Sequence, residues 1–316
     1  MRPFLAMQNL LGKKLTTTDI GWQISPLMNA SGRLGKPDTA IEMLLSTDQI
    51  HALESAQKLS ILNKERQKLG EDAWSRLQGK AKKSYEQFGT KLVMVYDENI
   101  ARGITGIIAT RLLKAFKCPS MVITRTDDGR AIGSMRSSSG FNCHDFLSRY
   151  AELFDDFGGH AQAGGFSLDP KKVDELCIRI SEDIDYMDCP DAEEEEALEI
   201  DAVLRPEEFN QNTIKVIERF EPYGEKSGPI EFLIEGARIE TITVMQNSKD
   251  PSQAHLRINL SYGSHQWPGV FWSAGPRVGR DFDEGDIVDV VFRMGRNYYK
   301  NQELIQLTLQ DIRRHL

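Results

Sequence analysis

The chain has 316 residues, enough for two domains, and its 40% hydrophobic content is typical of folded rather than disordered proteins. No apolar run approaches the roughly 20 residues that a membrane span needs, and no secretory signal is evident at the start, so we expect a cytoplasmic protein with no membrane partner. The net charge of −8 is unevenly divided, since residues 1–149 hold 22 Lys and Arg against 14 Asp and Glu, and residues 150–316 hold 17 against 33. A polyanion could therefore bind the first half, although solvated surface charge would give the same imbalance.

The chain begins with short helices and turns over residues 1–47. From Asp48 to about Phe88 the apolar residues recur at helical spacing without an interrupting proline, which predicts one long helix. At 1.5 Å per residue, a continuous helix of this length would reach roughly 60 Å. Such a helix is typical of a connector, so we assign residues 1–88 to an interdomain helical segment.

Residues 89–188 have the pattern of an α/β domain. Compact apolar strands and apolar helices alternate there, and strand, helix and strand at this spacing form a βαβ unit with a parallel pair. The expected strands are Lys91–Tyr96, Ser120–Thr124 and Ala131–Met135. The expected helices are Ile104–Phe116, Asp145–Phe157 and Lys171–Ile184, with a glycine-rich turn between the last two.

An acidic boundary follows at residues 189–197, where Glu193–Glu196 repel one another and resist packing. We interpret it as a linker, with an acidic mimic of nucleic acid or a partner-docking tail as the alternative. In residues 198–316, short alternating segments separated by turns predict a small β-barrel preceded by a helix near Asn212–Arg219. The expected strands are Phe232–Ile234, Arg238–Val244, Ala254–Leu260, Gly269–Trp272, Ile287–Arg293 and Leu304–Ile312.

Two segments of the α/β domain combine glycine with groups that bind phosphate. In residues 158–160 (GGH), two glycines let the backbone approach a ligand, and the histidine can donate to a phosphate oxygen or protonate a leaving group. Residues 133–137 (GSMRS) place an arginine among hydroxyls at the end of a strand, a combination that suits phosphate. A plain glycine turn and a flexible polar loop would each explain one segment taken alone.

Two further segments carry arginine beside glycine, in residues 29–33 (NASGR) and 101–111 (ARGITGIIATR). Arg102 precedes the expected N-terminus of a helix, where the dipole and free N–H groups favour anions. Arg111 is expected to be a solvated residue or a member of a local ion pair.

Together these four segments resemble, in order and spacing, the C-terminal half of RecJ-type single-strand DNA exonucleases, which belong to the DHH phosphoesterase superfamily. The segments are similar to the family's NAxGR stretch, its HRGxxGIxAxR helix, its GSxRS loop and its GGHxxAxG turn. The last motif also occurs in other DHH-associated domains, whereas the NASGR stretch and the barrel favour RecJ. The resemblance covers nearly the whole chain and implies a DHH-associated α/β domain joined to a long connector helix, followed by an all-β OB-fold barrel.

The resemblance also implies a set of site residues. The expected contacts to the phosphates of a bound strand, including its 5′ end, are Arg33, Arg102, Ser134, Arg136 and Ser137. His160 would act close to the scissile phosphate, with Gly158 and Gly159 permitting its approach. Ala101 stands where the family commonly has histidine, which removes one donor.

The barrel is expected to add base stacking, because OB-folds hold single strands on aromatic rings within a basic groove. We expect Tyr298 and Tyr299 to stack, since they lie in a predicted turn beside Arg296 and Lys300, and we expect Phe271 in the core. The other aromatic and basic candidates are Trp267, Trp272, Arg257 and Arg293.

The superfamily's chemistry needs two divalent ions held by Asp and His residues, including an Asp-His-His triplet. This sequence contains neither Asp-His-His nor His-x-Asp, so we expect no metal site and no activity in this chain alone. Mn²⁺ or Mg²⁺ would be held by an N-terminal DHH catalytic domain, in the same or a separate chain.

The expected function is therefore the substrate-binding C-terminal half of a 5′→3′ single-stranded DNA exonuclease, a hydrolase of DNA repair and recombination. Its expected partners are single-stranded DNA and the catalytic domain, with a single-strand-binding protein as a further candidate. The alternatives are a stand-alone nucleic-acid-binding module without catalysis and the half of an oligonucleotide or RNA phosphodiesterase.

Overall fold

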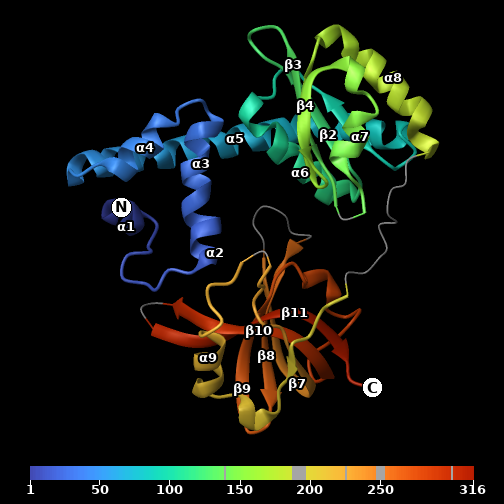
Figure 1. Cartoon of the computed structure of the whole chain (residues 1–316). Coiled ribbons are helices and arrows are strands. Elements are labelled where there is room, and N and C mark those ends of the chain that lie inside the picture. The colour runs from blue at the N-terminus through green and yellow to red at the C-terminus, as the bar shows by residue number, and fades with distance from the viewer. Residues whose placement is uncertain (139, 187–196, 225, 247–252, 300–301) are drawn as a thin grey trace. The chain divides into compact units, whose positions relative to one another are not determined.

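The computed structural model (Figure 1) describes residues 1–138, 140–186, 197–224, 226–246, 253–299 and 302–316, without the side chains of residues 211, 297–299 and 302–303. The chain divides into two compact units, Met1–Glu195 and Glu196–Leu316. All but the last residue of the acidic boundary 189–197 lies outside the described residues. Among the described helices, none is both long and apolar enough to cross a membrane.

The first unit begins with a helical arm. Its elements are α1 (Arg2–Met7), α2 (Thr17–Asp19), the π-helix η1 (Ile20–Ile24), α3 (Ser25–Arg33) and α4 (Asp38–Leu45). A cluster that includes Phe4, Leu27 and Met43 packs these helices against Leu59 of the following helix, α5.

The long helix α5 (Gln49–Gln87) has 39 residues and confirms the predicted connector. It begins where the side chain of Asp48 accepts hydrogen bonds from the N–H groups of Ile50 and His51, a typical N-cap. At 1.5 Å per residue its length is about 58 Å. It therefore links the arm to the sheet that follows.

The sheet of the first unit has the strand order β1-β2-β3-β5-β4. The strands are β1 (Val93–Tyr96), β2 (Ser120–Arg125), β3 (Ala131–Arg136), β4 (Phe154–His160) and β5 (Ala163–Leu168). β1 and β2 are parallel and are joined by η2 (Arg102–Ile104) and α6 (Thr105–Phe116), whereas the other neighbours are antiparallel. The predicted βαβ unit is thus present at the first two strands.

Two apolar layers cover this sheet. On one face, Val122 packs with Ile108 and Leu112 of α6 and with Ala73 and Leu77 of α5. The other face packs against α7 (Cys143–Ser148) and α8 (Val173–Asp183), as Figure 1 shows. The alternating burial of β3 sends its odd-numbered residues into the core and leaves its even-numbered residues half-buried on the α6 side.

The expected helix over Asp145–Phe157 is wrong beyond Ser148. The helix α7 ends there, and Phe154–His160 instead forms β4, which pairs with β5 through a two-residue turn at Ala161-Gln162. The apolar residues of this segment suit both periods, but the glycines at its end favour a hairpin over a helix. The sequence GGH is therefore the end of a strand and not a turn.

The second unit is a closed barrel with the strand order β10-β11-β9-β8-β7-β6, closed by pairing of β10 with β7. The strands are β6 (Ala202–Val203), β7 (Phe232–Met245), β8 (His255–Tyr262), β9 (His265–Phe271), β10 (Ile287–Tyr299) and β11 (Gln302–Arg314). The helix α9 (Gln211–Ile217) precedes the barrel proper. This arrangement confirms the predicted small β-barrel.

One predicted break in the barrel is absent. The segments Phe232–Ile234 and Arg238–Val244 form the single strand β7, because the chain passes through an irregularity at Gly236, whose φ is +74°. The N–H of Gly236 donates to the carboxylate of Asp289 instead of to the ladder. A glycine in a strand pattern here marks a bulge and not a turn.

Candidate nucleic-acid interface

Ser134 and Arg136 lie on β3 and face α6. The hydroxyl oxygens of Ser134 and Thr105 are 2.9 Å apart, which ties the strand to the first turn of α6. Arg136 lies over the same turn, because a Cβ added at Gly106 would be 2.6 Å from Nη2 of Arg136. Gly106 is therefore what allows the guanidinium to approach the N-terminus of this helix, where free N–H groups already favour anions.

Arg33 joins this region from the arm. It lies in the last turn of α3, and its Nη1 donates to the carbonyl oxygen of Gly103 at 2.9 Å. The backbones also touch, since a Cβ at Gly103 would lie only 1.9 Å from the carbonyl oxygen of Arg33. The structure thus brings together three of the four predicted segments at one place, through glycines that permit close contact.

The charges of Arg33 and Arg136 have no carboxylate partner in the part of the chain that the structure describes. Burial lowers the pKa of Arg136, and the positive charge of Arg33 lowers it further. Among the described residues, no carboxylate lies within ion-pair distance of either arginine. Arg111, by contrast, pairs with Glu71 at 3.1 Å and lies over the Trp74 ring, which confirms the predicted local ion pair. We call Arg33, Ser134 and Arg136 the arginine cluster.

Arg102 adjoins this cluster through its backbone, because its carbonyl oxygen accepts from Thr105 Oγ1 at 3.0 Å. It is exposed in η2 and lines a polar cavity at the carboxyl ends of β1 and β2. Arg125 and Glu98, which pair at 3.5 Å, line the same cavity, together with Asp127 and Asp128. Its predicted phosphate contact stays a prediction, in surroundings of mixed charge.

Ser137 holds two predicted segments together. It is buried, its N–H donates to the carbonyl oxygen of Gln162, and its hydroxyl is 2.9 Å and 3.1 Å from the carbonyl oxygens of Phe141 and Ala161. The N–H of Cys143 also donates to Ala161. The end of β3 is therefore fastened to the β4–β5 turn. The predicted phosphate contact of Ser137 remains untested, and its hydroxyl has a structural role.

Strand register places the glycine-rich hairpin beside the arginine cluster. Gly165 and Gly158 stand in one row with Ser134, and His160 stands in the row of Arg136, with an alanine between them. Directly paired residues share a face of a sheet. Gly158, Gly165 and His160 are exposed. The sheet surface next to the cluster therefore consists of exposed glycine backbone with the imidazole of His160 beside it.

The two glycines before His160 serve different purposes. Gly159 has a φ of +147°, and a Cβ there would lie 2.2 Å from the carbonyl oxygen of Ala163, so the fold requires glycine. A Cβ at Gly158 would meet nothing within 4 Å. The fold therefore tolerates a side chain at Gly158, and the open space there is available to a ligand.

The barrel supplies fewer basic groups than the sequence suggested. The side chains of Tyr298 and Tyr299, and Lys300 altogether, lie outside the described part of the structure, so their stacking stays a prediction. The two tyrosines end the strand β10 and do not lie in a turn. The cations nearby are engaged, because Arg293 bonds Glu231 and Arg296 bonds Glu218, both at 2.6 Å.

Two other aromatic predictions have clear outcomes. Phe271 is buried in the barrel core, as predicted. Trp272 is 58% exposed and its ring meets His255 edge-on at 4.9 Å. Trp272 is thus the exposed ring that the described aromatic candidates offer to a base, with the exposed Arg257 on the same strand as His255.

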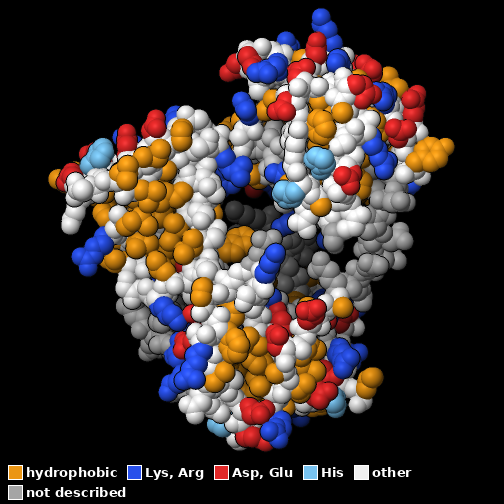
Figure 2. Space-filling model, viewed as in Figure 1, with side chains coloured by type: hydrophobic (Ala, Val, Ile, Leu, Met, Phe, Trp, Pro, Cys, Tyr) orange, Lys and Arg blue, Asp and Glu red, His pale blue; other side chains and the backbone are white. Residues whose placement is uncertain are grey.

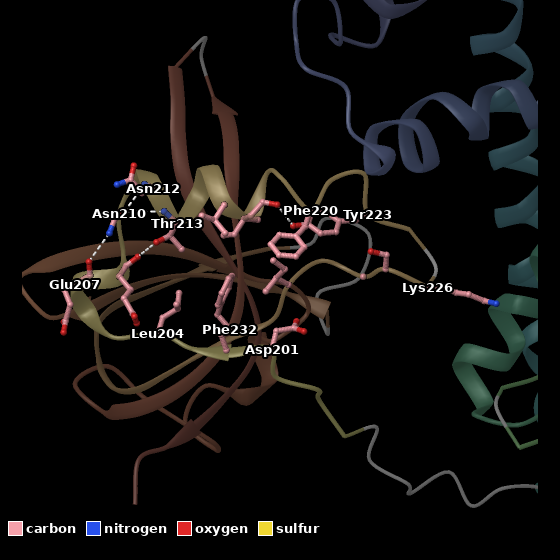
Figure 3. A pocket seen from close by; sticks show the side chains of 17 residues that line it. Asp201, Leu204, Glu207, Asn210, Asn212, Thr213, Phe220, Tyr223, Lys226 and Phe232 are labelled. Carbon is pink, nitrogen blue, oxygen red and sulfur yellow. Dashed lines mark hydrogen bonds between the residues drawn. The ribbon is translucent and has the colours of Figure 1, made fainter.

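The barrel unit also contains a pocket of about 850 Å³ beside α9 (Figure 3). Its lining mixes apolar and polar side chains, and the hydroxyl of Tyr223, which lines it, donates to the carbonyl oxygen of Ile217. The charged residues that line it are Asp201, Glu207, Glu208 and Lys226. Carboxylates outnumber the single lysine, so the pocket is chemically unsuited to a phosphate strand.

No metal centre is formed by the residues described. Within them, no three His, Cys, Asp or Glu side chains gather in a way that could hold an ion. The residues present therefore do not fit the two-ion centre of the superfamily, and no catalytic step through a metal is derived from this chain.

Comparison with known proteins agrees with the two folds. A DHHA1 domain model matches residues 89–184, and a RecJ OB domain model matches residues 200–311. The chain matches the C-terminal half of RecJ. The resemblance drawn from the four sequence segments is thereby confirmed, as are the α/β domain with its long helix and the OB-fold.

The proteins similar to this chain include several RecJ proteins. The single-stranded-DNA-specific exonuclease RecJ of Bacillus subtilis is 29% identical over 298 residues, which is 92% of this chain and 36% of that protein. The RecJ of Salmonella typhimurium is 30% identical over 189 residues, 58% of this chain and 33% of that protein. The crystal structure of Thermus thermophilus RecJ with Mn²⁺ has a TM-score of 0.73 at 22% identity, covering 99% of this chain and 44% of that one. This chain therefore spans less than half the length of these RecJ proteins.

Sequence reasoning missed two contributors to the site. Thr105 holds Ser134, and Gly106 makes room for Arg136. Both lie inside the segment 101–111 that was singled out for its arginines. The signal available was a small residue and a hydroxyl in the first helical turn, but only the packing of α6 on β3 shows what they touch.

Proposed function

We propose that this chain is the strand-gripping part of a RecJ-type exonuclease. The arginine cluster would hold phosphates of a single DNA strand, and the bare hairpin with His160 would receive the scissile end, delivered 5′ first to two metal ions in a DHH catalytic domain. The observation that supports this most is the half-buried Arg136 beside Arg33 with no carboxylate partner among the described residues. Guanidinium groups bind phosphate through paired N–H donors, so an anion would balance both charges.

The hydroxyl pair of Ser134, in the cluster, and Thr105 would adjust its hydrogen bonds to the ligand. Thr105 Oγ1 is 3.0 Å from the carbonyl oxygen of Arg102 and 2.9 Å from Ser134 Oγ, and each hydroxyl has one proton. While Thr105 donates to Arg102, Ser134 donates to Thr105. If Ser134 turns its proton to a phosphate, Thr105 can donate to Ser134 instead, so no hydroxyl loses its partner.

The apolar surface of the arm also supports a further domain. Figure 2 shows hydrophobic side chains gathered on the helical arm. The exposed ones of the arm and early α5 include Trp22 (78%), Leu45 (74%) and Ile50 (70%). Exposed apolar patches on soluble proteins commonly mark interaction surfaces, and the remaining length of the RecJ relatives offers a partner of suitable size.

The direct test uses this chain and a fluorescent single-stranded DNA with a 5′ phosphate, at low and physiological salt, with Mn²⁺ present and cleavage followed in the same sample. We expect binding that weakens with salt by a slope of about −0.7 per phosphate contact, without cleavage. Arg136→Ala and Arg33→Ala should weaken binding about tenfold each. The ion-paired Arg111→Ala is the matched control and should bind as the unaltered chain does.

Three results would contradict or redirect the proposal. Unchanged binding in both Arg33→Ala and Arg136→Ala would exclude the arginine cluster as the binding site. Cleavage that survives repurification and is lost in His160→Ala would mean that the chain holds its own catalytic centre. A ribose strand that binds as well as the deoxyribose strand would favour the RNA alternative.

A further inference from the structure

A third arginine stands next to the cluster, on the long helix. Arg66 of α5 is half-buried, and its Nη2 donates to Oδ1 of Asn63 at 2.8 Å, one turn earlier. Its Nε is shielded from solvent and has no hydrogen-bond partner among the described residues. The bond to Asn63 fixes the position of the guanidinium and uses one of its five N–H groups, while the Nε–H is covered by protein.

Arg33 links Arg66 to the arginine cluster. Burial lowers the pKa of Arg66, and the charge of Arg33 lowers it further. Arg33 lowers the pKa of Arg136 in the same way, and it bonds the carbonyl oxygen of Gly103 three residues before Gly106, over which Arg136 lies. The helix α3 that carries Arg33 packs along α5. Three guanidinium groups from three elements thus share one region of the first unit.

This arrangement is costly without a ligand. No ion pair involves Arg66 in the part of the chain that the structure describes. A half-buried cation with a like charge beside it and no acid opposes folding. In the described residues, twelve other arginines, Arg111 among them, have a carboxylate within ion-pair distance. An anion larger than one phosphate would relieve the repulsion that Arg33 exerts on Arg66 and on Arg136.

We infer that Arg66, held by Asn63, binds a second phosphate group of the strand, so that the site takes two phosphates bridged by Arg33. The inference rests on the proposed function and goes beyond it by defining the smallest ligand that fills the site. One phosphate would be held by Arg136 with Ser134 and the other by Arg66. A nucleoside monophosphate would then occupy only part of the site, whereas a 5′-phosphorylated dinucleotide would occupy all of it.

The test compares two probes on the full chain, thymidine 5′-monophosphate and 5′-phosphorylated thymidine dinucleotide, by calorimetry at low salt. The unaltered chain should bind the dinucleotide more tightly. Arg66→Met, which keeps length but removes charge, should weaken the dinucleotide about tenfold and leave the monophosphate unchanged. Arg33→Met should weaken both probes. Arg111→Met is the matched control on a paired arginine and should change neither.

Thermal unfolding separates a binding role from a structural one. Without ligand, Arg66→Met should melt at the same temperature as the unaltered chain or higher, because an unpaired charge has been removed. Its stabilisation by pyrophosphate should be smaller. Arg66→Lys, which keeps the charge without the fork, should bind the dinucleotide with intermediate affinity.

The inference and the proposed function fail in different ways. Unchanged dinucleotide affinity in Arg66→Met, with a loss in Arg33→Met, would overturn the second phosphate alone. An equal loss for both probes would place Arg66 at the first phosphate and also overturn it, as would a melting temperature that falls together with affinity. If the unaltered chain binds neither probe nor a longer strand, the proposed function fails as well.

Discussion

Single residues in the GGH segment should separate folding from binding. Gly159→Ala forces a side chain into a φ of +147° and against the carbonyl oxygen of Ala163, so we expect a loss of about 1–3 kcal/mol in the free energy of unfolding. Gly158→Ala meets nothing within 4 Å and should leave stability within about 0.5 kcal/mol of the original. Denaturant unfolding of the two variants measures both values.

The same pair of variants also tests the open backbone beside the cluster. If a strand passes over the bare hairpin, Gly158→Ala should weaken binding of a 5′-phosphorylated strand although the protein folds normally. A stable Gly158→Ala chain with unaltered affinity would show that the ligand does not approach this backbone. Loss of stability in Gly158→Ala and not in Gly159→Ala would contradict the geometry given above.

At the scale of residues, the chemistry of a side chain can be predicted from the sequence more readily than the residues that surround it in the fold. Arg33 and Arg136 were predicted as phosphate ligands, and the fold brings both to the start of α6. Ser137 was predicted on the same grounds, yet burial turns its hydroxyl toward backbone carbonyls. Arg66 gave no signal, because a charged residue in a polar helix looks like a solvated one until α3 packs beside it.

At the scale of elements, long periodic segments were predictable and short glycine-rich ones were not. The helix α5 matched its expected limits to within a residue, since 39 residues repeat one period without a proline. The hairpin β4–β5 was mistaken in part for a helix, because its strand pairing lies beyond the reach of local periodicity. The bulge at Gly236 has the same origin, since its N–H finds its partner 53 residues away.

The contact of Asp289 in β10 with Arg313 and His315 should stabilise the barrel less at low pH. Asp289 of β10 is buried, which raises its pKa, but hydrogen bonds from His315, Arg313 and the N–H of Gly236 outweigh burial and leave the pKa below its ordinary value. A carboxyl group with a lowered native pKa stabilises the fold above its unfolded value, near 3.9, and that contribution disappears as pH falls through the native pKa.

We therefore expect Asp289→Asn to destabilise the barrel unit by about 1–2 kcal/mol at pH 7. The difference from the unaltered chain should shrink as pH falls below about 4, where the aspartate itself becomes protonated. Urea unfolding at several pH values measures this, with the exposed Glu199→Gln as control. A difference that stays constant down to pH 2 would mean that packing, and not charge, accounts for the loss.

At the scale of the whole molecule, net charge does not attract a polyanion. Residues 1–195 contain 25 Lys and Arg against 28 Asp and Glu, and residues 196–316 contain 14 against 19, so both units are acidic. Fields beyond about 8 Å are screened at physiological salt, so a local cluster can still bind. Affinity for DNA should accordingly come from the arginine cluster and any stacking in the barrel, and not from long-range steering.

The division into units predicts how the chain can be cut. The sequence boundary at residue 88 stays a proposal, but Ala73, Leu77 and Ala81 of α5 are buried against the sheet core, so a cut there would expose an apolar layer. Among the residues that the structure describes, no core cluster has members on both sides of 195/196. We expect residues 1–195 and 196–316 to fold separately, each with its own cooperative transition in calorimetry.

Binding by the two pieces then shows whether both units hold one strand. For the 5′-phosphorylated dinucleotide, residues 1–195 should bind as tightly as the whole chain, because only the arginine cluster and Arg66 are engaged. For a strand long enough to reach both units, the whole chain should bind more tightly than either piece or their mixture, since tethering raises the effective concentration of the second contact. Trp272→Ala should remove part of that advantage in the whole chain and none of the dinucleotide affinity. Equal affinities of the whole chain and residues 1–195 for every strand length would mean that the barrel does not contribute to gripping the strand.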